Sequence, residues 1–96
     1  MGRKAEAVVC ELCGRVTPGR FAEKHHLVPR SKGGEETIDV CCHCGDHVHR
    51  LFSNKELAET YNTLEALRSE ERMQKWIRWV SKRDSFTFTM KRKKGR

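Results

Sequence analysis

Four of the five cysteines form two Cys-x-x-Cys pairs, Cys10 with Cys13 and Cys41 with Cys44, and 27 residues separate the two pairs. A pair with this spacing can hold one side of a metal ion from a tight turn, and two pairs supply the four thiolates of a tetrahedral zinc site. Two matched pairs seldom arise by chance in so short a chain. We therefore predict one structural zinc ion that is bound by both pairs, and we do not expect Cys42 to be a ligand.

The composition explains why such a chain needs a metal. It has 96 residues, of which 36% are hydrophobic and 34% are charged, so a single small domain must fold around a thin core. Domains of this kind are commonly stapled by disulfides or by a metal ion. The first six residues are polar, and no stretch is apolar enough to span a membrane. We therefore expect a cytoplasmic location, where reducing conditions favour metal binding over disulfides.

Positive charge is concentrated towards the C-terminus. The net charge is +7, yet residues 72–96 contain ten lysines and arginines and a single acidic residue, Asp84. A basic segment suits a polyanionic partner, because each Lys or Arg at a phosphate releases condensed counterions. The charge of residues 91–96 is equally compatible with a tail that only aids solubility. Basicity alone therefore does not decide between nucleic-acid binding and no partner.

Hydrophobic patterning and turn residues predict the order of the elements. We expect a hairpin over residues 8–16 with Gly14 at a positive φ, an extended segment over 21–28, a polar loop over 29–34 and a strand over 36–41. One helix should start at an Asp46 N-cap and reach Phe52, and a second should follow Ser53 and run through Leu67. A third should span about residues 70–82. Its apolar stripe consists of Met73, Trp76, Ile77 and Val80.

The string His25-His26-Leu27-Val28-Pro29-Arg30-Ser31-Lys32-Gly33-Gly34 lies between the cysteine pairs, and His49 follows the second pair. This pattern resembles the His-Asn-His (HNH) endonuclease family. There, a His-His-x-x-Pro-Arg-Ser-Lys-Gly-Gly strand and loop precedes an Asn-bearing strand and a helix with a late histidine. The resemblance covers about residues 10–52, and residues 54–67 also resemble a bacterial subgroup. It implies an α+β fold with a small ββα-metal core, a zinc knuckle and C-terminal helices.

The resemblance also implies roles for the three histidines. His25 and His49 would bind a catalytic divalent ion, and His26 would be the general base that takes a proton from water. Neighbouring strand residues point to opposite faces, which agrees with separate roles for His25 and His26. Arg30 and Lys32, in the loop beside the base, would hold phosphates. The expected partner is DNA, with no membrane involved.

Two positions depart from the family pattern. Gly45 stands where relatives often have a histidine, one helical turn before His49. With fewer protein ligands, the site should favour hydrated Mg²⁺ or Mn²⁺ over tightly held zinc, and Asp46 and His47 are possible stand-ins. The middle asparagine is also absent, because its slot falls on Glu36 or Thr37; we assign it to Thr37.

We therefore expect one domain, with the zinc knuckle and ββα-metal core over 7–52, a helical extension over 54–83 and a basic tail over 84–96. The expected function is metal-dependent hydrolysis of DNA phosphodiester bonds, by nicking or double-strand cleavage. The alternative is a zinc-stabilised nucleic-acid-binding module whose nuclease activity has decayed, which the two departures favour. A third possibility, a structural zinc adaptor for a protein partner, explains the cysteines but leaves the histidine pair without a role.

Overall fold

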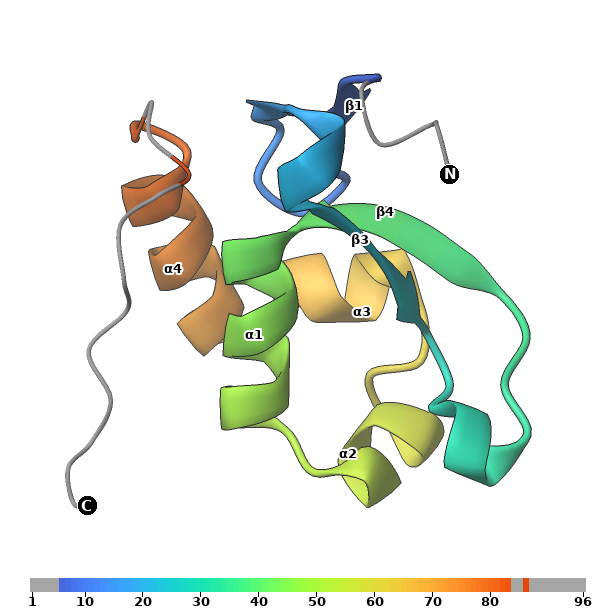
Figure 1. The fold of residues 1–96 in the computed structure, drawn as a ribbon. Helices are drawn as coiled ribbons and strands as arrows, with labels where there is room; N and C mark the ends of the chain where they lie inside the picture. Colours follow the sequence, from blue (N-terminus) through green and yellow to red (C-terminus); the bar gives the residue numbers. More distant parts are fainter. Residues whose placement is uncertain (1–5, 84–85, 87–96) are drawn as a thin grey trace, which may run out of the picture.

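Two antiparallel strand pairs and four α-helices make up the described part of the chain, residues 6–83 and 86 of the computed structural model (Figure 1). The strands are β1 (Val8–Val9), β2 (Val16–Thr17), β3 (Ala22–His26) and β4 (Thr37–Cys41). The helices are α1 (Cys42–Leu51), α2 (Asn54–Glu59), α3 (Leu64–Ser69) and α4 (Glu71–Val80), with 3-10 turns η2 (Gly19–Phe21) and η3 (Arg30–Lys32). The predicted α+β class with helices after the strands is confirmed.

The first hairpin is the predicted knuckle. Strand β1 pairs with β2 in the register Val8↔Thr17 and Val9↔Val16, which leaves residues 10–15 as the connecting turn. Gly14 has a φ of +84°, the left-handed conformation that glycine adopts without a steric penalty. The Gly14 N–H donates to the Cys10 carbonyl over 2.8 Å, so the turn closes on itself and directs Cys10 and Cys13 towards the same side.

The second hairpin places the histidine pair. Strands β3 and β4 are antiparallel, with His25 opposite Ile38 and His26 opposite Thr37. On β4 the buried side chains of Ile38 and Val40 alternate with partly exposed neighbours, the pattern of a strand with one face in the core. Helix α1 follows directly and packs on both strands, as Figure 1 shows. The β3–β4–α1 unit is therefore the scaffold of the site.

Helix α1 begins five residues before the predicted start. Its N-cap is Cys41, whose sulfur accepts a hydrogen bond from the Cys44 N–H over 3.4 Å. The prediction that Asp46 caps this helix was wrong, because the second knuckle itself forms the first helical turn. Asp46 instead lies inside the helix and pairs with Arg50 over 3.1 Å.

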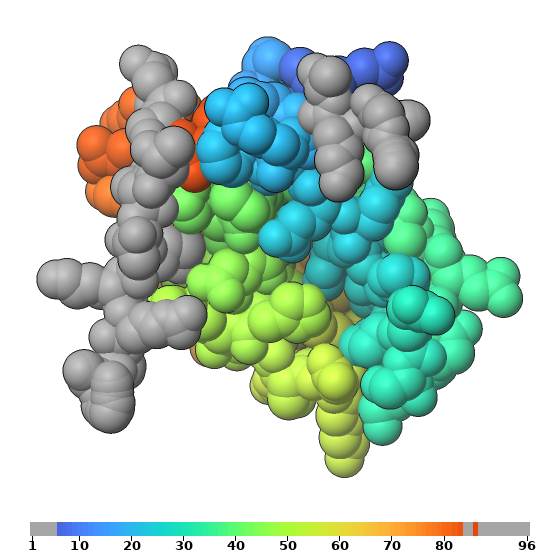
Figure 2. Space-filling model, in the orientation of Figure 1, coloured from blue at the N-terminus to red at the C-terminus, as the bar shows by residue number. Residues whose placement is uncertain are grey.

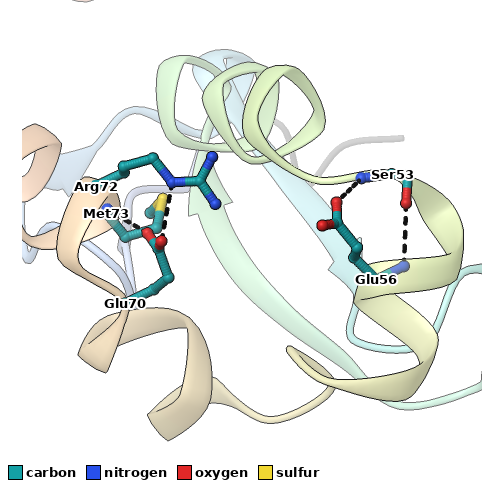
Figure 3. A network of polar contacts seen from close by, with 5 residues as sticks. All are labelled: Ser53, Glu56, Glu70, Arg72 and Met73. Carbon is teal, nitrogen blue, oxygen red and sulfur yellow. Dashed lines mark hydrogen bonds and ion pairs between the residues drawn. The ribbon is translucent and has the colours of Figure 1, made fainter.

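The predicted second helix is divided into α2 and α3. Thr63 caps α3 by accepting a hydrogen bond from the Ala66 N–H, and the Asn62 side-chain amide donates to the Ala58 carbonyl, so the chain turns between the two helices. Ser53 caps α2 in a capping box with Glu56 (Figure 3). Reciprocal bonds of this kind define where α2 starts after α1.

Helix α4 packs its predicted stripe onto the core. Met73 and Val80 are fully buried, and Trp76 and Ile77 are partly buried against the same cluster. Glu70 caps the helix by accepting a hydrogen bond from the Met73 N–H over 3.0 Å, and its other oxygen accepts one from Arg72 (Figure 3). The predicted basic tail over 84–96 lies, apart from Phe86, outside the described residues.

Candidate functional site

The four paired cysteines converge on one buried cluster. The sulfurs of Cys10, Cys13, Cys41 and Cys44 all lie within 4.8 Å of one another, and Cys13 and Cys41 are 4.0 Å apart. Ligand sulfurs of a tetrahedral zinc site, each about 2.3 Å from the metal, lie roughly 3.8 Å apart. The cluster is thus positioned to bind a metal ion, and its size and donor set are consistent with zinc.

Hydrogen bonds to the sulfurs favour the thiolate form that a metal requires. The Cys13 and Cys44 N–H groups donate to the Cys10 and Cys41 sulfurs, each over 3.4 Å. Hydrogen bonds from the Cys10 and Cys13 side chains hold the pKa of the Cys41 thiol well below its usual range. The two knuckles therefore have the same local geometry although they come from a hairpin turn and a helix start.

A buried arginine, which sequence reasoning missed, supports this cluster. Arg15 is 7% exposed and donates through Nη2 to the Cys41 sulfur over 3.4 Å, close to His43 Nδ1. Its Nη1 also donates to the Arg83 carbonyl, and its guanidinium lies 4.0 Å from the Phe86 ring centroid. Arg15 follows the first cysteine pair by two residues, and this closeness in sequence was the signal that could have identified it. Cys42 and His43 lie outside the four-sulfur cluster.

The histidines predicted from the string lie around one pocket of about 310 Å³. One wall is β3 with η3, and the other is the end of α1 with the start of α2; Figure 2 shows these two walls meeting on one face of the molecule. His25, His26 and His49 all line the pocket. Residues from separate elements are thus brought together by packing α1 on the β3–β4 hairpin.

His25 and His49 contact each other across the pocket. Their ring centroids lie 5.5 Å apart at an interplanar angle of 62°. His25 is only 5% exposed, and its Nε2 has no hydrogen-bond partner among residues 6–83 and 86. Burial, together with the neighbouring His49 and His26 rings, lowers the pKa of His25 to about 4. At neutral pH this imidazole is therefore uncharged.

His26 is half-buried at the end of β3, on the strand face opposite His25. It lies across from Thr37, the residue assigned to the slot of the missing asparagine. Thr37 does not line the pocket, so it is connected to the site by the pairing of β4 with β3. The pairing places Thr37 beside the predicted base.

The loop after His26 is held by its own backbone. Gly33 has a φ of +84° and caps η3, while Gly34 lies so close to the Val28 carbonyl that a side chain there would overlap with it. The N–H of Leu27 also donates to the Glu36 carbonyl over 3.0 Å. Arg30 lines the pocket, whereas Lys32 is exposed and does not. The two predicted phosphate contacts therefore occupy different positions relative to the histidines.

Asp46 and His47, the two residues considered as replacements for a ligand at position 45, make other contacts. His47 stacks on Trp76 with centroids 4.1 Å apart, and Asp46 pairs with Arg50. Glu23 is the acidic residue that reaches Gly45: a side chain at position 45 would collide with its carboxylate. Glu23 was missed by sequence reasoning, although its spacing of two residues from His25 on a strand was an available signal.

Two curated proteins are similar to this chain. It is 37% identical over 81 residues to the uncharacterized protein YisB of Bacillus subtilis (strain 168), covering 82% of this chain and 79% of YisB. It is 34% identical over 61 residues to the type IV methyl-directed restriction enzyme EcoKMcrA of Escherichia coli (strain K12). That alignment covers 53% of this chain and 22% of EcoKMcrA. No family model and no solved structure matches the chain.

In the part of the chain that the structure describes, none of the helices combines the length and apolar character needed to cross a membrane.

Proposed function

We propose that this protein, which belongs to the same family as YisB of Bacillus subtilis, is a metal-dependent DNA endonuclease of the HNH type. The similarity to EcoKMcrA supports this proposal, because that protein is a restriction enzyme. In this assignment, residues 7–52 form the zinc knuckle and ββα-metal core, residues 54–83 the helical extension and residues 84–96 a basic tail. Zinc at the four cysteines is structural, and a second divalent ion acts in the histidine pocket.

The observation that carries the proposal is the unpartnered nitrogen of His25. A buried imidazole nitrogen without a hydrogen bond is costly, and native structures rarely keep one without a role. His25 Nε2 is such an atom, and the His49 ring lies 5.5 Å from the His25 ring in the same pocket. Two imidazoles at this separation fit a divalent ion between them. When bound, that ion supplies positive charge to the scissile phosphate and to the leaving oxygen.

The remaining residues of the pocket suit hydrolysis. His26 lies on the opposite strand face from His25, so its imidazole is available to accept a proton from the attacking water while His25 holds the ion. Arg30 lines the same pocket and supplies a planar cation that can hold the phosphate oxygens through two hydrogen bonds. Thr37, across from His26 on β4, acts as a positioning residue for the strand that carries the base.

The alternative function is a zinc-stabilised nucleic-acid-binding module without cleavage. It is favoured by Thr37, because a threonine in the slot of the family's asparagine cannot offer an amide to the loop that carries the base. The loop's backbone hydrogen bonds argue against it, since Leu27 to Glu36 and Gly33 to Arg30 already close the loop. We therefore prefer the enzyme.

The test is plasmid cleavage. Supercoiled plasmid incubated with the zinc-loaded protein and either Mg²⁺ or Mn²⁺ should be converted to nicked or linear DNA. His25→Ala should abolish the conversion, whereas His47→Gln, which changes a histidine of α1 that lies outside the pocket, should not. Intact plasmid with every divalent ion, together with retained DNA binding, would favour the binding module.

A further inference from the structure

Arg15 is a buried cation beside the four-cysteine cluster. Only 7% of it is exposed, although arginine is almost never fully buried unless its charge is paired. Its Nη2 donates a hydrogen bond to the Cys41 sulfur over 3.4 Å and lies 3.4 Å from His43 Nδ1. A guanidinium has donors and no acceptor, so the sulfur and the ring nitrogen are both acceptors. Arg15 therefore directs its positive charge at one sulfur of the cluster.

The cluster needs such a cation when it holds zinc. Four thiolates and one Zn²⁺ carry two more negative charges than positive ones. All four cysteines are buried, so water screens this excess poorly, and a buried charge is costly unless it is paired and hydrogen-bonded. A guanidinium at one sulfur supplies one of the missing positive charges through a charge-assisted hydrogen bond, which is stronger than a neutral one.

The same guanidinium also contacts the chain that leaves α4. Its Nη1 donates to the Arg83 carbonyl over 3.1 Å, just beyond Val80, where α4 ends. The Arg15 Cζ atom lies 4.0 Å from the centroid of the Phe86 ring, and that ring stacks on Phe21 with centroids 5.8 Å apart. The chain after α4 thus returns to the turn of the first hairpin at two points, and Arg15 contacts both.

The planar shape of the guanidinium makes these contacts depend on one another. Its nitrogens form a rigid fork, so the bond from Nη2 to the Cys41 sulfur restricts the direction in which Nη1 points to Arg83. The same bond orients the plane that lies against Phe86. A lysine could bring a charge to the sulfur, but its single nitrogen cannot provide the other two contacts.

We propose that Arg15 is the counter-ion of the zinc-bound thiolates and the residue through which the zinc site holds the end of α4 in place. This inference rests on one part of the proposed function, the zinc ion at the four cysteines. Arg15 acts through the Cys41 sulfur and does not bind the metal, so it is a positioning residue.

The zinc affinity of the full-length protein, measured by competition with a coloured chelator, tests the counter-ion. Arg15→Met removes the charge and keeps an unbranched side chain. It should weaken zinc binding about 10- to 100-fold, the range for residues that support metal ligands. Arg15→Lys restores the charge without the fork and should recover part of this loss. Equal zinc affinities of the two variants would overturn the role of the charge.

Arg20→Met is the matched control. It makes the same chemical change on an exposed arginine whose guanidinium lies 4.9 Å from the Phe21 ring centroid. An exposed charge contributes little, so zinc affinity should change about fivefold or less. If Arg20→Met weakened zinc binding as much as Arg15→Met, Arg15 would act only through the net charge of the protein, and the inference would be wrong.

Cobalt in place of zinc gives a readout that a loss of packing would not change. Thiolate-bound Co²⁺ has a sulfur-to-metal charge-transfer band, and a hydrogen bond to the sulfur draws electron density away from it. Removal of the Arg15 donor should therefore lower the energy of this transition and move the band to longer wavelength. Arg20→Met should leave the band in place. An unchanged band in Arg15→Met would contradict the hydrogen bond to Cys41.

A double-mutant cycle tests the link to the end of α4. Phe86→Leu removes the ring beside the guanidinium and should weaken zinc binding about two- to fivefold, the range for a cation–π contact. In the Arg15→Met background the same change should have a smaller effect, because only the contact with Phe21 is then lost. Equal effects in both backgrounds would show that the end of α4 is held independently of the metal site.

The outcomes separate this inference from the rest of the proposed function. Failure of the wild-type protein to bind zinc would overturn both this inference and the structural zinc. Tight zinc binding without plasmid cleavage would contradict the endonuclease and leave the role of Arg15 intact. Circular dichroism of each metal-loaded variant shows whether it has folded.

Discussion

The indole N–H of Trp76 donates a hydrogen bond to the sulfur of Cys44 over 3.3 Å. Helix α4 thereby contacts the cysteine cluster although the two residues are 32 positions apart in sequence. The same indole ring stacks on His47 of α1, with centroids 4.1 Å apart. Trp76 therefore adds a polar contact with the cysteine cluster to the packing of α4 on the core, and the two parts should unfold together.

Trp76→Phe tests this connection. The change keeps an aromatic ring against His47 but removes the donor to Cys44, so unfolding should become easier by about 1–2 kcal/mol, the range for a buried hydrogen bond. Urea unfolding of the zinc-loaded protein measures it. Trp79→Phe makes the same chemical change on a ring that is 45% exposed and should cost less. Equal effects of the two changes would contradict a specific role for the Trp76 bond.

Removal of zinc should unfold the domain. Apparent binding free energies of structural zinc are about 10–16 kcal/mol, as large as the whole stability of many domains. Cys13→Ser should therefore give a protein that fails to fold or melts far below the wild type, measured by circular dichroism with and without a strong chelator. Cys42→Ser is the control, because Cys42 lies outside the cluster. Unchanged melting after complete metal removal would exclude a structural role.

Much of the fold could be predicted because it depends on local signals. The Gly14 turn, the Ser53 cap and the stripe on α4 are each specified by residues close in sequence. The start of α1 and the break before Thr63 were missed. In both places a side-chain cap decides the boundary: the Cys41 sulfur at one and the Thr63 hydroxyl at the other. A thiol that both caps a helix and joins a cluster is not apparent from helix propensity.

The site was predictable to a lesser extent. The resemblance of the sequence to the HNH pattern pointed to His25, His26 and His49. These three residues line one pocket in the structure. Glu23 and Arg15 were missed, because their contacts arise from packing between elements distant in sequence. Glu23 contacts a helix 22 positions later, and Arg15 reaches a sulfur 26 positions later. Neither contact has a signature in the sequence beyond strand alternation.

Stability should fall in mild acid because of His25. Its pKa is lowered from 6.5 to about 4, so the unfolded chain binds this proton more readily than the folded one. The stabilisation is fully present above pH 6.5 and is lost as the pH falls towards 4. Between pH 8 and pH 5 the loss should be about 2 kcal/mol. His25→Gln should lack this component in urea unfolding, and an unchanged acid dependence in this variant would contradict the assignment.

Arg30 and Lys32 should differ in their effect on DNA. Arg30 lines the pocket, so Arg30→Ala should weaken DNA binding and also slow cleavage of bound DNA. Lys32 lies outside the pocket, so Lys32→Ala should weaken binding alone. Each lost phosphate contact should reduce the slope of log affinity against log salt by about 0.9. Binding isotherms at several salt concentrations and single-turnover cleavage separate the two effects. Identical single-turnover rates for the two variants would refute the distinction.

The sharpest prediction separates the adjacent histidines. His26→Ala should keep Mn²⁺ and DNA binding but lose about two to four orders of magnitude in cleavage rate, because only proton transfer is removed. His49→Ala should lose cleavage through weaker metal binding, so excess Mn²⁺ should partly restore it. Excess metal should leave His26→Ala inactive, whereas added imidazole should restore part of its activity. Single-turnover nicking of plasmid over a range of Mn²⁺ and imidazole concentrations measures both rescues. Rescue of His26→Ala by metal, or full activity without His26, would show that the base lies elsewhere in the pocket.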